Sequence, residues 1–145
     1  MPNLVLELRQ GDLMVLNGAS IRFRTKARIE LAARARFLFG KQIMPATAAD
    51  SPARRIYFAL QTAYVGTDAE QTVGLAQANS LIEAFKAATT SVLASEILDR
   101  AMLAARADDC YQALKLVRRI IRHEDAVLGR ADGFAALAPI AVAAV

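Results

Sequence analysis

The chain has 145 residues, of which 55% are hydrophobic and 22% are charged, and its formal net charge is +4. This apolar fraction excludes a chain that is disordered throughout, and about 150 residues bury enough surface to fold without a disulfide or a metal ion. Cys110, the one cysteine, cannot close an internal disulfide, which fits a reducing compartment. We therefore expect a cytoplasmic protein with no cofactor, no metal site and no membrane contact.

The N-terminal residues have the pattern of short β-strands. Leu4, Leu6 and Leu8 alternate with other residues, which predicts a strand with one leucine face that we expect to be central in a small sheet. After an apolar run at residues 13–16, Asn17-Gly18 is the dipeptide that most readily forms a two-residue hairpin turn. The sequence therefore predicts an antiparallel sheet at the N-terminus.

Basic side chains alternate with apolar ones between residues 19 and 31. An extended strand would place Arg22, Arg24, Lys26 and Arg28 on one face, about 7 Å apart, and a turn near Thr25 would fold this ladder into two strands. Such a face is commonly no more than the solvated side of a sheet. A binding role is favoured by the near absence of acidic residues on that face, because like charges repel each other there.

Two more arginines, Arg34 and Arg36, keep the same parity, in a segment (residues 31–39) that fits either a strand or a helical turn. Residues 1–60 together carry ten basic and four acidic side chains, a net charge of +6, whereas the rest of the chain carries −2. This asymmetry favours an anionic partner for the N-terminal part, most commonly a nucleic acid.

The rest of the chain has helical periodicity. We expect four helices, at about residues 53–65, 68–88, 92–106 and 110–128. Their N-terminal caps are predicted at Ser51 or Asp50, at Asp68, at Ser91 and at Asp108 or Asp109, and Gly129 ends the last helix. The predicted fold class is α+β, with a small basic antiparallel sheet at 1–45, a helical bundle at 50–128 and an apolar tail at 129–145.

Three features of the predicted bundle point to surfaces. Arg54 and Arg55 should project outward from the first turn of the first helix, where cations do not suit the helix dipole, and so should contact the sheet or a partner. Phe58 is outside the apolar stripe of that helix and should pack on a second surface, the sheet or a partner. The fourth helix should expose a second basic stripe, most simply a solvated face, made of Lys115, Arg118, Arg119 and Arg122.

Patterns of known catalytic chemistry are not found in the sequence. Gly40-Lys41-Gln42 lacks the earlier glycine and the hydroxyl residue of a phosphate-binding loop. His123 and Cys110 suggest no base that activates a nucleophile. We do not expect an enzyme.

Several segments resemble the flagellum biosynthesis repressor family called FlbT. The most distinctive is SPARRIYFALQ at residues 51–61, and the others lie at residues 4–9, 11–12, 15–19, 35–38, 42–44 and 111–118. The resemblance covers most of residues 3–123, and it departs in the alanine-rich second and third helices and in the tail.

The resemblance implies a regulator that acts after transcription, associates with the 5′ leader of flagellin mRNA and promotes its decay. Together with the charge asymmetry, it makes the RNA-binding candidates Arg22, Arg24, Lys26, Arg28, Arg34, Arg36, Arg54 and Arg55. The alternative is a protein-binding adaptor or flagellin export chaperone that affects mRNA indirectly. Besides the mRNA leader, the expected partners are flagellin or another flagellar regulatory protein, and the chain could form a homo-oligomer.

Overall fold

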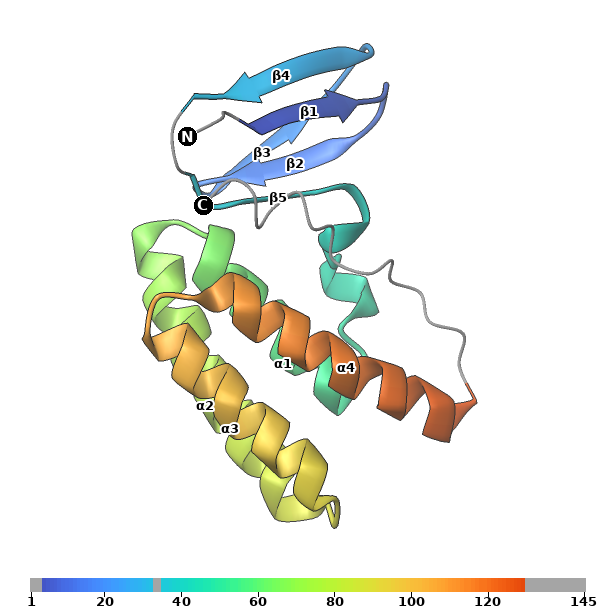
Figure 1. Ribbon diagram of the computed structural model, residues 1–145, viewed down its shortest axis with the longest axis vertical. Helices are drawn as coiled ribbons and strands as arrows, with labels where there is room; N and C mark the ends of the chain where they lie inside the picture. Colours follow the sequence, from blue (N-terminus) through green and yellow to red (C-terminus); the bar gives the residue numbers. More distant parts are fainter. Residues whose placement is uncertain (1–3, 33–34, 130–145) are drawn as a thin grey trace. The chain divides into compact units, whose positions relative to one another are not determined.

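The computed structural model describes residues 4–32 and 35–129, which divide into two compact units. One unit holds the N-terminal residues up to Ile43, and the other begins at Met44. Figure 1 shows that all the strands belong to the first unit and all the α-helices to the second. The predicted α+β fold class is confirmed.

The described residues of the N-terminal unit form five strands in two antiparallel sheets. The first sheet pairs β1 (Leu4–Leu8) with β4 (Ala27–Leu31), and the second has the order β3-β2-β5, from Ala19–Arg22, Leu13–Leu16 and Phe37–Phe39. The prediction that β1 is the central strand is wrong, because among the described residues β1 pairs with β4 alone, and β2 is central in the other sheet. Its leucine alternation is confirmed, since Leu6 and Leu8 are buried.

The hairpin between β2 and β3 has the predicted turn. Asn17 and Gly18 have φ angles of 50° and 86°, the two positive values that a type I′ turn requires. Leu16 stands opposite Ala19, and the pairing runs back to Leu13 opposite Arg22. The turn thereby sets the register of the hairpin.

The chain changes sheets directly after β3. Phe23 extends the pairing of β3 by one residue: its N–H donates to Asp12 O at 2.9 Å and its carbonyl accepts from Gly11 N at 2.6 Å. Residues 24–26 then form the bend, and β4 begins at Ala27, opposite Leu8 of β1. The turn expected near Thr25 is therefore present, but it connects two different sheets.

Residues 31–39, for which the sequence allowed either a strand or a helical turn, end in a strand. Phe37–Phe39 forms β5 and is followed by a short 3₁₀ helix, Gly40–Gln42. Phe37 and Leu38 are buried, and the Phe37 and Phe39 rings stack with centroids 6.4 Å apart. Burial of both faces explains why this strand lacks the apolar–polar alternation of β1.

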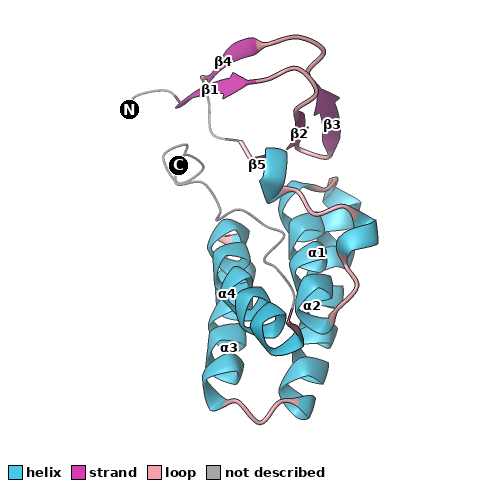
Figure 2. Cartoon of the chain, turned by 90° about the vertical axis from the view of Figure 1, so that its right-hand side faces the viewer, coloured by secondary structure: helices cyan, strands magenta, loops and turns pink. Residues whose placement is uncertain are grey.

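The C-terminal unit, as far as the structure describes it, forms four α-helices, shown in Figure 2. They are α1 (Pro52–Val65), α2 (Asp68–Ala88), α3 (Val92–Arg106) and α4 (Cys110–Leu128), and the 3₁₀ helix Ala46–Ala48 precedes them. These bounds agree with the predicted ranges to within one residue.

The helix caps follow the sequence with one exception. Ser51, Ser91 and Asp109 cap α1, α3 and α4, and Gly129 adopts the left-handed conformation after α4. The cap of α2 is Thr67 rather than Asp68. Thr67 and Glu70 form a reciprocal capping box, in which each side chain bonds the backbone N–H of the other residue.

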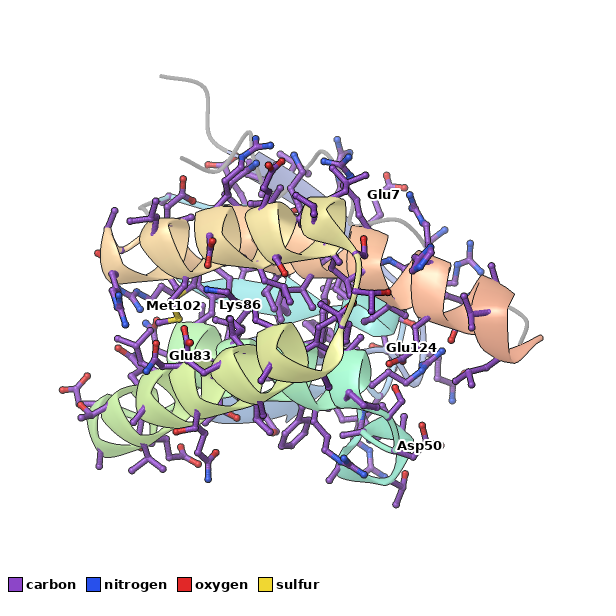
Figure 3. The ribbon with its side chains drawn as sticks, turned by 90° about the horizontal axis from the view of Figure 1, so that it is seen from below. Glu7, Asp50, Glu83, Lys86, Met102 and Glu124 are labelled. Atoms are coloured by element: carbon purple, nitrogen blue, oxygen red, sulfur yellow. The ribbon has the colours of Figure 1, made fainter. Side chains whose placement is uncertain are left out.

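Helix α1 packs against both α2 and α4, and α3 packs against α4 and α2. The α1–α2 contact depends on Gly74, because a Cβ there would lie 2.7 Å from Ala63 N and 2.8 Å from Ala59 O. Between α2 and α3, Lys86 forms an ion pair with Asp99 at 2.6 Å, and Figure 3 shows this lysine beside Glu83. No helix of the described residues is long and apolar enough to cross a membrane.

Candidate nucleic-acid interface

The basic segment, defined here as residues 22–28, contains four cationic and no acidic side chains. Arg22 ends β3, Arg24 and Lys26 lie in the bend, and Arg28 lies in β4. All four side chains are exposed. The predicted ladder is therefore replaced by a short cationic bend between two strands.

The two ends of the basic segment differ from its middle. The Arg22 guanidinium donates a hydrogen bond to Gly11 O at 2.9 Å, which fixes its position on the sheet. Arg28 stands directly opposite Glu7 in the β1–β4 register. The expectation of a nearly acid-free face is therefore wrong at this end, because sequence parity does not show which strand becomes the neighbour. Arg24 and Lys26, in the bend, form the centre of the cationic surface.

One aromatic ring accompanies these charges. Phe23 is half-buried, and its backbone is fixed by the hydrogen bonds to Gly11 and Asp12. An aromatic side chain held between cations can stack on an unpaired base. Phe37, the next aromatic residue along the chain, is fully buried and cannot stack on a base.

The other N-terminal candidates are less clearly placed. Arg36 is half-buried just before β5, and its carbonyl accepts a hydrogen bond from Asn17 N at 3.2 Å. Arg34 lies outside the described residues, as does most of the predicted tail at 129–145. RNA contacts by Arg34 and Arg36 stay predictions.

Arg54 and Arg55 are separated by the fold. The prediction that Arg54 projects outward is wrong: its side chain is buried, and Nη2 donates to both carboxylate oxygens of Asp125, at 3.0 and 2.8 Å. Burial against α4 removes Arg54 from any surface that could bind RNA. Arg55 is exposed, as expected, and its part in RNA binding stays a prediction.

The basic stripe of α4 is also reduced by the packing. Lys115, Arg119 and Arg122 are exposed, whereas Arg118 is buried near Tyr57 of α1. Burial raises the pKa of Tyr57 well above its ordinary value of 10, and the Arg118 charge partly opposes this shift. Arg118 thus belongs to the interior of the helical unit, not to the predicted stripe.

Sequence reasoning missed two acidic residues of α4, Glu124 and Asp125, that bind the start of α1. Glu124, labelled in Figure 3, accepts hydrogen bonds from Ser51 Oγ and, at 3.1 Å, from the backbone N–H of Ala53. Two adjacent carboxylates on α4, Glu124 and Asp125, therefore bind the first turn of α1, where a helix dipole favours negative charge. Two adjacent acids late in an otherwise basic helix were the signal available in the sequence.

This geometry shows why the motif at residues 51–61 is distinctive. Its Ser51 caps α1, its Arg54 pairs with Asp125, and its Tyr57 is fully buried. Gln61 bonds both backbone groups of Met44, accepting from N at 2.7 Å and donating to O at 3.0 Å. Most of the motif therefore specifies packing, and a match to it identifies the fold of a family rather than a ligand site.

A family match found by comparison with known proteins includes this motif. The family described as "Flagellar protein FlbT" matches residues 4–128. The chain belongs to the FlbT family. The family is regulatory rather than catalytic.

Two relatives are similar over most of the chain. A "Probable flagellum biosynthesis repressor protein FlbT" of Mesorhizobium japonicum is 30% identical over 145 residues, covering 97% of this chain and 96% of the relative. "Probable flagellum biosynthesis repressor protein FlbT 2" of Bradyrhizobium diazoefficiens is 31% identical over 128 residues, covering 85% and 90%. No solved structure matches.

Proposed function

We propose that this member of the FlbT family represses flagellum biosynthesis after transcription, by binding the 5′ leader of flagellin mRNA through the basic segment and promoting its decay. The observation that carries the proposal is the set of four exposed cations within residues 22–28, on a segment without an acidic residue. Arg22 and Arg28 are held by their strands, and Arg24 and Lys26 extend the charge across the bend.

The electrostatics of the segment fit a single-stranded RNA backbone. Phosphates along a strand bind such cations with little regard for sequence, and each contact releases counterions, so affinity falls as salt rises. Selectivity for one leader would then come from unpaired bases and from the folded shape of that leader. Phe23, which lies within the segment, is the residue that we propose to contact such a base.

The test is a salt titration of leader RNA binding by the purified protein. Four phosphate contacts predict a slope of log K against log salt of roughly −3, at about −0.7 per phosphate on a single strand. Arg24→Ala with Lys26→Ala should reduce this slope by roughly one to one and a half units while leaving thermal unfolding unchanged. The matched control, Lys115→Ala with Arg119→Ala on the exposed face of α4, should keep the wild-type slope.

Two results would contradict the proposal. If the control variant loses binding and the Arg24/Lys26 variant retains it, the RNA site has been placed on the wrong surface. If the protein binds the leader no better than a scrambled RNA at every salt concentration, direct recognition fails. The alternative is then a protein-binding adaptor or flagellin export chaperone, with an indirect effect on mRNA.

A further inference from the structure

A groove of about 470 Å³ lies between α1 and α2 and is built from helical-unit residues alone. Phe58 of α1 and Leu81 of α2 form its apolar walls, and Ala76 of α2 keeps it open. Its polar lining comes from Gln77, Ser80 and Arg55. This surface explains the position of Phe58 outside the apolar stripe, because the ring faces the groove and is half-exposed.

The shape of the groove is set by the close contact of its two helices. Gly74 allows α1 and α2 to touch at Ala59 and Ala63, and the groove begins beside this contact, lined by residues that precede Ala63 in α1 and follow Gly74 in α2. Seven of the eight lining residues belong to these two helices, which therefore set most of the shape of the groove, and Ala49, in the loop before α1, completes the lining. Rigid, mostly apolar grooves between helices are sites into which another helix inserts apolar side chains.

The positive charge of Arg55 indicates which kind of ligand the groove would bind. Arg55 is the one charged residue that lines the groove, and within the described part of the chain its exposed guanidinium forms no ion pair. A groove with one cation and mostly apolar walls does not suit an RNA backbone, which needs several cations in a row. It suits an apolar side chain that has a carboxylate one helical turn away.

We propose that this groove binds an amphipathic helix of a partner protein, with an aliphatic or aromatic side chain between Phe58 and Leu81 and an Asp or Glu paired with Arg55. The site is independent of the proposed RNA contacts. It gives Arg55 a protein carboxylate as its ligand in place of the RNA phosphate that the sequence suggested.

The test uses the full chain and two helix-stapled synthetic peptides. Both carry leucines on one face, and they differ only in a Glu or a Lys one turn from the central leucine. Fluorescence anisotropy measures affinity, and amide chemical shifts locate the contact. The Glu peptide should bind about tenfold more tightly than the Lys peptide, a difference on the scale of one close charge pair, with shifts at Arg55, Phe58 and Ser80.

Charge reversal and groove filling make the test specific. Arg55→Glu should invert the order of the two peptides, and Ala76→Phe should reduce Glu-peptide affinity at least tenfold by occupying the groove. The matched control, Ala87→Phe on an exposed position of α2, should bind as the wild type does. Leader RNA affinity should be unchanged in Arg55→Glu, which separates this site from the RNA proposal.

Equal affinity for the two peptides, or shifts away from the groove, would overturn the assignment. Failure of both peptides to bind the full chain would also overturn it. Loss of leader binding in Arg55→Glu, with no effect on the peptides, would assign the residue to RNA instead.

Discussion

Arg54 in the first turn of α1 and Asp125 near the end of α4 form a buried ion pair between residues 71 positions apart in the sequence. The two side chains are 4% and 3% exposed, and both carboxylate oxygens accept from the same guanidinium nitrogen. Glu124, the residue before Asp125, bonds Ser51 and Ala53 at the same helix end. The end of α4 is thereby fastened to the beginning of α1.

Removing Arg54 should therefore destabilise the helical unit strongly. Arg54→Ala would leave the Asp125 carboxylate buried without its cation, and breaking such a pair typically costs about 3–5 kcal/mol. Arg55→Ala, one position along and exposed, should change stability by less than about 0.5 kcal/mol. Urea unfolding of the two variants measures the difference directly.

A double substitution separates the charge from the packing. Arg54→Met with Asp125→Leu removes both charges and keeps apolar volume, so it should recover much of the loss, since replaced ion pairs are often close to neutral. Equal stability of Arg54→Ala and Arg55→Ala would contradict the buried pair.

The close contact of α1 and α2 predicts that Gly74 tolerates no larger side chain. In Gly74→Val the Cβ would meet backbone atoms of Ala59 and Ala63, which cannot rotate away, so the helices must separate. Overpacking of this kind costs about 1–3 kcal/mol. Ala84→Val, at an exposed position of the same helix, should cost only the lower helix propensity of valine, below about 0.7 kcal/mol. Equal melting temperatures of the two variants would show that α1 and α2 lie farther apart.

The capping box at the start of α2 predicts a pH dependence. The hydrogen bonds from Thr67 hold the pKa of Glu70 below its ordinary value of 4.5. A carboxyl group whose pKa is lowered by folding stabilises the protein above the unfolded pKa, and that contribution is lost as the pH falls through the folded pKa. Glu70→Gln should therefore show a smaller loss of stability than the wild type between neutral pH and acid.

Thermal unfolding at a series of pH values tests this prediction, with Glu83→Gln as the control on the same helix. Glu83 Oε1 lies 3.7 Å from Lys86 Nζ, and Glu83 takes no part in the cap. If Glu70→Gln and the wild type lose stability in parallel on acidification, the capping box does not set the pKa of Glu70.

The position of Phe23 predicts a contribution to RNA affinity that does not depend on salt. Phe23→Leu keeps an apolar side chain but removes the aromatic face, and stacking on one base is worth about 1–3 kcal/mol. Affinity for a single-stranded leader segment should fall at least fivefold while the salt slope stays that of the wild type. Ile21→Ala, at an exposed position of β3, is the matched control and should have little effect.

The outcomes of this experiment are separable. A wild-type affinity of Phe23→Leu would show that phosphate contacts act without base stacking. A reduced salt slope in the same variant would show that the substitution has displaced the neighbouring cations.

Local features of the fold could be predicted because they depend on residues close in the sequence. The Asn17-Gly18 turn needs two positive φ angles, which those two residues adopt readily, so the β2–β3 hairpin follows from the dipeptide. The helix bounds follow in the same way from caps such as Ser91 and from Gly129. The predicted cap of α2, Asp68, was wrong by one position. Thr67 and Asp68 can both accept a backbone hydrogen bond, so the sequence alone did not distinguish them.

Features that depend on distant partners were decided by the tertiary structure alone. The alternation of residues 19–31 predicted which side chains share a parity, but not that β4 would pair with β1 and place Arg28 opposite Glu7. Periodicity likewise assigned Arg54 and Arg118 to exposed faces, because it treats every charge as solvated. A buried charge is stable only beside its partner, and no local pattern shows that Asp125 will lie beside Arg54, or that Gly74 will bring two helices close enough to form a groove.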